Sequence, residues 1–206
     1  MATRKAGDDL KDVIRDFRRE QVIDVARRLF GERGTTDVSM DEIAVEAGVA
    51  RSTVYVYFAN RDELLRACLK GMHNQLLDDI AATWEQDADP ARRLERLIEG
   101  MLERIDADPA FFRLALVAQA SVSQGGEAVG TELAQIGLNI ARLISDLYVE
   151  GVAVGTFRDI DSDQATALIG QQIYGAMSVR AGEPLPEPAA VVAAATCAFI
   201  LRGLGA

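Results

Sequence analysis

The side chains with the clearest chemistry stand together between Arg51 and Val56. Arg51 can donate two hydrogen bonds to a guanine edge, Ser52 can donate or accept one, and Val56 can lie against a thymine methyl group. Side chains near the N-terminus of a helix can reach base edges in the major groove of DNA. We therefore predict base contacts at Arg51, Ser52 and Val56.

Hydroxyl and guanidinium groups around this segment suit the phosphate backbone of a nucleic acid. Arg61 falls in the first turn of the next predicted helix, where its charge adds to free backbone amides that can hold a phosphate. The predicted phosphate contacts are Ser39, Thr53, Tyr55 and Arg61.

Positioning these side chains requires two short helices held at a fixed angle. The pattern of residues 39–58 predicts such a pair of helices. Ser39 and Glu42 form a capping-box pattern at the start of the first helix. Ala44 allows the helices to cross closely, and Gly48 can adopt the left-handed backbone that the turn requires. The residues that would form the helix-turn-helix core are Ile43, Ala44, Ala47, Gly48, Val49, Val54 and Tyr57.

Helical spacing of apolar residues recurs along the chain and strand signals are almost absent, so we expect an all-α protein of about nine helices. Asp-Ala-Asp-Pro occurs at residues 87–90 and again at 106–109, where an aspartate can cap a helix that proline begins. We predict a flexible N-terminal extension over residues 1–17, a helix-turn-helix domain over 18–69, and a larger helical bundle over 70–206.

Charge separates the same regions. Residues 1–70 hold 13 Lys and Arg against 13 Asp and Glu, whereas the remainder holds 9 against 19. The acidic body would repel DNA, so we expect binding to be local and sensitive to salt. The extension carries Arg4, Lys5 and Lys11, which leaves a minor-groove arm as an alternative to a disordered tail.

Residues 39–65 resemble the DNA-binding signature of TetR-family regulators. They read S-M-D-E-I-A-V-E-A-G-V-A-R-S-T-V-Y-V-Y-F-A-N-R-D-E-L-L, and the run from Tyr55 to Leu65 is the most diagnostic part. The resemblance covers residues 18–69. Beyond them only the length, the helix count and the turn at residues 155–158 match the family.

Three positions depart from the family pattern. Ala50 stands where a hydroxyl-bearing helix cap is frequent, Tyr57 where histidine is frequent, and Arg61 where lysine is frequent. These departures bear on which operator is read more than on DNA binding itself. The resemblance implies a bacterial, cytoplasmic, ligand-responsive transcription regulator. Its commoner mode is repression, in which a small effector releases a homodimer from a pseudo-palindromic operator in double-stranded DNA.

The resemblance also implies a ligand cavity within the fourth to seventh helices. Few ionisable groups fall on the inner faces there, so we expect an apolar or amphipathic effector. His73, the single histidine, could contact a ligand or report pH, but a structural role is the simpler reading. The candidate pocket residues are Trp84, Met101, Phe111, Phe112, Gln119, Tyr148 and Tyr174.

Dimerisation through the last two helices is implied in the same way. Small residues there permit close helix approach, and leucine and isoleucine provide apolar area, although a core within one chain would use the same composition. The candidate interface residues are Leu168, Gly170, Ile173, Gly175, Ala194, Ala198 and Leu201.

Two other classes of function compete with this interpretation. An enzyme is disfavoured because the sequence has one histidine, no paired cysteines and no phosphate-binding glycine loop, and we expect no cofactor and no metal. Cys68 and Cys197 are expected to be buried thiols, and no segment is long and apolar enough to predict a membrane span. A helical scaffold module without DNA recognition is the remaining alternative.

Overall fold

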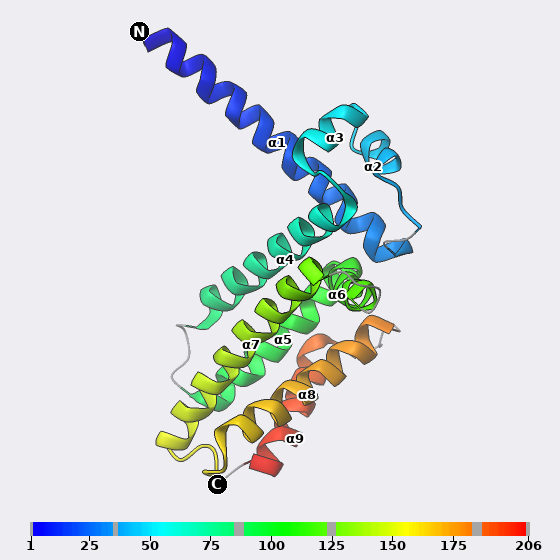
Figure 1. Cartoon of the computed structure of the whole chain (residues 1–206). Coiled ribbons are helices and arrows are strands. Elements are labelled where there is room, and N and C mark those ends of the chain that lie inside the picture. The colour runs from blue at the N-terminus through cyan, green and yellow to red at the C-terminus, as the bar shows by residue number, and fades with distance from the viewer. Residues whose placement is uncertain (1, 35–36, 85–88, 123–126, 183–186, 205–206) are drawn as a thin grey trace. The chain divides into compact units, whose positions relative to one another are not determined.

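The computed structural model describes residues 2–34, 37–84, 89–122, 127–182 and 187–204. Within these ranges it omits the side chains of residues 2–11, 81–84, 111, 116–117, 119–122, 127–128 and 182. The described chain is built from nine helices with no strand, as the sequence predicted (Figure 1). No helix within the described ranges is long and apolar enough to cross a membrane.

The helices form two compact units. One holds residues 1–71 and 113–132, and the other holds residues 72–112 and 133–206. The first unit contains α1 (Ala2–Arg33), α2 (Met40–Glu46), α3 (Arg51–Tyr57), the start of α4 (Arg61–Trp84) and most of α6 (Pro109–Val122). The second contains the rest of α4, α5 (Pro90–Ala107), most of α7 (Glu127–Ala153), α8 (Ser162–Gly182) and α9 (Ala189–Leu204).

Helix α1 is longer than the sequence suggested. It begins at Ala2, so residues 2–17, for which we expected a flexible extension, are helical and project past α2 and α3 (Figure 1). This stretch has no proline, and Arg15 forms an ion pair with Asp12 one turn earlier. Helical continuity from the packed part of α1, rather than burial, extends the helix, since Val13, Ile14 and Phe17 are exposed.

Helix ends follow the local chemistry of the sequence. The Asn60 side chain accepts a hydrogen bond from the Glu63 amide at 2.9 Å at the start of α4, and Asp161 does the same for the Gln164 amide at 2.9 Å at the start of α8. Asp89 caps α5 ahead of Pro90. Gly34 follows α1 with φ +85°, a left-handed conformation that suits glycine.

In the second unit α5, α8 and α9 lie side by side (Figure 1). The apolar face of α5 supplies buried Leu94, Ile98 and Leu102. At the C-terminal end of α5, Asp106 of the second Asp-Ala-Asp-Pro motif accepts hydrogen bonds of 2.6 and 2.5 Å from the Arg180 guanidinium of α8. Pro109 begins α6 as expected, but the sequence had not shown that Asp106 binds an arginine 74 residues away.

The two cysteines are buried and free, as predicted. Burial raises the pKa of the Cys68 thiol to about 12 and that of Cys197 to about 11. Both thiols therefore stay protonated at neutral pH, which leaves them as packing groups rather than nucleophiles.

Candidate nucleic-acid interface and effector pocket

The residues predicted for the helix-turn-helix core lie on α2, on α3 and in the turn between them. Ile43, Ala44, Ala47 and Val54 are buried, while Val49 and Tyr57 are half-buried. Gly48 has φ +64°, and the Val49 amide donates to the Ala44 carbonyl at 3.0 Å across the turn. This hydrogen bond and the small Ala44 side chain hold α2 close to α3.

Helix α3 has one buried side and one open side. Val54 is fully buried and Phe58, which follows the helix, is 1% exposed. Arg51 and Ser52, at the start of the helix, are exposed. Val56 is 78% exposed, so the three predicted base contacts, Arg51, Ser52 and Val56, are all accessible to a ligand. Tyr55, a predicted phosphate contact, is 42% exposed. Ala50 provides no side-chain cap for α3, as its residue type implies.

The Arg51 side chain is held by two neighbours. Its Nε lies 2.9 Å from Asp41 Oδ1 in the first turn of α2. Its guanidinium carbon lies 5.5 Å from the centre of the Tyr55 ring, within cation–π range. From the sequence we assigned no role to Asp41. A signal was present in the sequence. Asp41 stands ten residues before Arg51, and the turn between α2 and α3 brings these two residues together.

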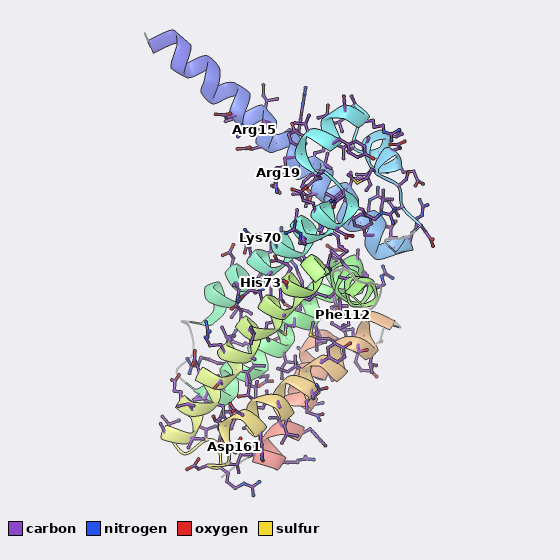
Figure 2. The ribbon with its side chains drawn as sticks, in the orientation of Figure 1. Arg15, Arg19, Lys70, His73, Phe112 and Asp161 are labelled. Atoms are coloured by element: carbon purple, nitrogen blue, oxygen red, sulfur yellow. The ribbon has the colours of Figure 1, made fainter. Side chains whose placement is uncertain are left out.

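Arg19 of α1, labelled in Figure 2, has a comparable role at the other end of α3. Its guanidinium carbon lies 5.2 Å from the centre of the buried Phe58 ring. The contact ties α1 to the residue that directly follows α3, and no local pattern in the sequence indicated it.

The predicted phosphate contacts occupy different environments. Ser39 Oγ accepts a hydrogen bond from the Glu42 amide at 3.1 Å, while Glu42 accepts from the Ser39 amide at 2.9 Å, which completes the expected capping box. Hydrogen bonds from the Ser39 backbone and side chain, with one from Arg33, hold the pKa of Glu42 below its ordinary value. Thr53 and Arg61 are half-buried at the starts of α3 and α4.

A cavity of about 390 Å³ lies between α4 and α5 in the second unit. Leu76, Ile80, Leu97 and Met101 supply its apolar wall. Charged side chains share this lining, which our expectation of few ionisable groups did not include. They are Asp79, Arg96, Glu103 and Arg104.

The charged side of the cavity is partly organised by hydrogen bonds. Arg104 donates to Gln75 at 2.5 Å and pairs with Asp79 at 3.2 Å, which joins α4 to α5. His73, one turn before the cavity on α4 and labelled in Figure 2, is 7% exposed. Its Nε2 lies 2.9 Å from the Asn139 amide nitrogen, so this buried histidine has a polar partner on α7.

Of the candidate pocket residues, Met101 lines this cavity. Phe112 and Tyr174 instead pack against each other in a tilted arrangement, with ring centres 5.7 Å apart. The buried Tyr148 stacks on Phe157 and its hydroxyl donates to the Arg158 carbonyl at 2.8 Å, which fixes the turn before α8. The side chains of Trp84, Phe111 and Gln119 lie outside the described residues.

The outer sides of α8 and α9 carry the other candidate surface. Leu168, Gly175, Ala194 and Ala198 are exposed, Gly170 and Leu201 are half-buried, and Ile173 is buried within its own chain. A groove of about 370 Å³ runs between the two helices. Its lining includes two exposed apolar residues that the sequence did not single out, Val179 and Phe199.

No group of three or more His, Cys, Asp and Glu side chains within the described ranges is arranged to hold a metal ion. Arg93 and Glu150 form an ion pair between α5 and α7, and Arg180 is the most buried arginine in the described part of the second unit. The charged pairs described in this unit join helices to one another.

This chain is similar in sequence to two known regulators and similar in structure to a solved transcriptional regulator. The HTH-type transcriptional regulator BetI of Rhizobium meliloti is 37% identical over 81 residues, and the match spans 39% of this chain and 40% of BetI. The fatty acid metabolism regulator protein of Bacillus subtilis is 24% identical over 75% of this chain and 77% of its own. The chain thus covers about two fifths of the BetI regulators it matches.

The structure of FadR from Bacillus subtilis in complex with stearoyl-CoA has the same fold, with a TM-score of 0.78 at 20% identity over 89% of this chain and 98% of FadR. A family model for the C-terminal region of YsiA-like proteins matches residues 69–180, more than half of the chain. The model of bacterial regulatory proteins of the tetR family matches residues 22–68, which hold the helix-turn-helix described above. The chain belongs to the tetR family of bacterial regulatory proteins.

Proposed function

We propose that the protein is a cytoplasmic transcriptional repressor that binds a pseudo-palindromic operator as a homodimer and leaves it when an amphipathic effector binds. The observation that carries the proposal is α3. Its core side is closed by Val54, while Arg51, Ser52 and Val56 stand exposed at the places where a recognition helix meets base edges.

The two kinds of DNA contact have different consequences. Arg51, Ser52 and Val56 would read bases, whereas Thr53, Tyr55 and Arg61 would hold phosphates irrespective of sequence. The Ser39 hydroxyl is engaged by Glu42 in the capping box, so a phosphate contact there would share that hydroxyl.

DNA binding is tested by fluorescence anisotropy on a site selected from random duplexes. We expect Arg51→Ala to weaken the selected site by about 10- to 100-fold and to relax base preference, because each bidentate base contact contributes about 1–3 kcal/mol. Arg61→Ala should weaken all sequences alike and flatten the salt dependence. If the wild-type protein binds no DNA in a salt-sensitive manner, the protein is better described as a helical scaffold.

The α4–α5 cavity supports the effector part of the proposal. An apolar wall beside charged groups fits a molecule with a hydrocarbon part and a polar or ionic part. Met101 and Leu97 provide the first environment, while Arg96 and Arg104 provide the second. Stearoyl-CoA, the ligand of the FadR structure, has both parts and is the probe we select.

The effector is tested by titrating stearoyl-CoA, coenzyme A and stearate into the protein–operator complex. We expect stearoyl-CoA to release the DNA, and Met101→Glu to raise the concentration required by more than tenfold because it places a charge in the apolar wall. Leu138→Glu, at an exposed site on α7, is the matched control. By linkage, operator DNA must weaken effector binding by the same factor, so equal effector affinities with and without DNA would contradict this mechanism.

The homodimer would form through α8 and α9. Their groove is lined by Val179 and Phe199, each more than half exposed in a single chain, and exposed apolar side chains of this kind are typical of an interface. Phe199→Glu should shift the protein to monomer in light scattering at micromolar concentration. Leu138→Glu, with similar exposure, should leave it a dimer, and a dimer retained by Phe199→Glu would place the interface elsewhere.

A further inference from the structure

The contact between Asp41 and Arg51 joins the two helices of the helix-turn-helix at its exposed side. Asp41 lies in the first turn of α2, and Arg51 is the first residue of α3. Their side chains are 52% and 66% exposed, and Asp41 Oδ1 lies 2.9 Å from Arg51 Nε. The Tyr55 ring, one turn further along α3, contacts the same guanidinium.

We propose that Asp41 is a positioning residue that presents Arg51 to a guanine, a proposal that rests on the proposed DNA-binding function. Arginine has one N–H at Nε and two at each terminal nitrogen. The contacts described for Arg51 engage Nε and the face of the guanidinium. Both terminal nitrogens therefore remain available as the fork that matches the O6 and N7 acceptors of guanine.

The position of the carboxylate also selects between two targets of Arg51. A free arginine on this surface could bind any phosphate as readily as a base, because phosphates attract every nearby cation. A carboxylate at Nε repels an anionic phosphate much more strongly than it repels the uncharged edge of a guanine. Asp41 should therefore reduce the sequence-independent affinity of Arg51 while leaving its base contact intact.

Holding the side chain in advance has a second effect on base recognition. A flexible arginine loses rotamer freedom when it docks on a base. Asp41 and Tyr55 restrict the guanidinium before DNA binds, so less of that freedom remains to be lost. The restriction depends on the angle between α2 and α3, which the left-handed Gly48 and the Val49–Ala44 hydrogen bond set.

A second ion pair on α2 provides a matched control. Glu46 lies 2.6 Å from Arg28 of α1 and is 53% exposed, nearly the same as Asp41. Glu46→Gln removes one negative charge from α2, as Asp41→Asn does. The partner of Glu46 is on α1, however, and not on α3. Any effect of net charge alone should therefore be common to Asp41→Asn and Glu46→Gln.

The experiment measures dissociation constants for the selected site and for all single-base variants of it. Arg51→Ala first identifies the base pair that Arg51 reads. We expect Asp41→Asn to reduce the preference for guanine at that pair by about tenfold, to strengthen binding to random DNA, and to leave preferences elsewhere unchanged. Glu46→Gln should keep the guanine preference, and Asp41→Glu, which retains the carboxylate, should restore part of it.

The double variant Asp41→Asn/Arg51→Ala separates positioning from direct contact. With Arg51 absent, Asp41→Asn should change nothing at that base pair. A change that persists would mean that Asp41 contacts a base itself, and an unchanged guanine preference in Asp41→Asn would show that the ion pair is incidental; either result overturns the proposal. Thermal melts of each variant confirm that it is folded. Absence of any wild-type DNA binding would instead remove the proposed function, and this inference with it.

Discussion

The helix-turn-helix and the second compact unit reach their structures by different kinds of contact. In the helix-turn-helix, Ser39 and Glu42 are three residues apart, and the hydrogen bond across the turn joins Ala44 to Val49. In the second unit Asp106 and Arg180 are 74 residues apart, and Arg158 donates to the Gly203 carbonyl from 45 residues away. Local chemistry thus predicts much of the first arrangement and little of the second.

The same contrast applies to the candidate functional surfaces. The exposure of Ser52 and Val56 follows from helix periodicity once Val54 is placed in the core, because each lies two residues from Val54. The cavity and the outer face of α8 and α9 depend on which sides other helices cover. Buried Tyr148 and exposed Phe199 are both aromatic residues on apolar helices, and only packing distinguishes them.

The largest effect is expected at the Asp106–Arg180 pair, because the charge that would lose its partner is buried. Arg180 is 7% exposed, and the hydrogen bonds from Arg180 hold the pKa of Asp106 below its ordinary value. Asp106→Asn should lower the free energy of unfolding by about 3 kcal/mol, the low end for breaking a buried pair because Asp106 itself is half-exposed. Urea denaturation measures it, with the exposed Asp78→Asn as control; equal losses would mean that the long-range pair contributes little.

The next effect is expected where α7 ends. A Cβ on Gly151 would lie 2.0 Å from the buried Phe157 ring. Gly151→Ala should therefore cost about 2 kcal/mol through overpacking. Gly137→Ala lies on the same helix with nothing within 4 Å of the added carbon, and it should stabilise the protein by about 0.5–1 kcal/mol. If urea denaturation showed that both substitutions change the free energy of unfolding in the same direction, the packing of Gly151 against Phe157 would be contradicted.

A smaller effect is expected at the turn of the helix-turn-helix. Gly48 has φ +64° and open space around an added Cβ, so Gly48→Ala introduces backbone strain without a clash. It should cost about 1 kcal/mol of stability. Gly100→Ala on α5, which also has open space but helical backbone, should not destabilise. A neutral Gly48→Ala would show that the local turn matters less than we infer.

The smallest effect is expected from the capping box, and it depends on pH. Because the pKa of Glu42 is lowered from about 4.5 in the folded protein, its stabilisation is present above the pKa of the unfolded chain and is lost as pH falls through the folded value. The stability difference between wild type and Glu42→Gln should hold from pH 7 to about 5 and then shrink. When Ser39→Ala is also present, the effect of Glu42→Gln on stability should depend less on pH. A stability difference between wild type and Glu42→Gln that grows as the pH falls would contradict this prediction.

Much of the candidate DNA site was predictable, for a physical reason. Ser39, Gly48 and Val54 act through hydrogen bonds, dihedral angles and periodicity within one or two turns, all of which residue type and spacing encode. Asp41 was missed because its partner Arg51 lies across the turn, so its role requires the angle between α2 and α3. The helical N-terminal extension was missed because residue type alone did not distinguish a helix continued from α1 from a flexible tail.

The sequence by itself determined that the described chain is helical and where most of its helices begin and end, because these depend on periodicity, caps and turns. It also determined that Cys68 and Cys197 would be buried thiols. The tertiary structure alone decided that Asp41 engages Arg51, that Asp106 binds Arg180, and which apolar side chains line a cavity or remain exposed. Those features require side chains from separate helices to meet, and helix-helix geometry, rather than spacing along the chain, sets which ones do.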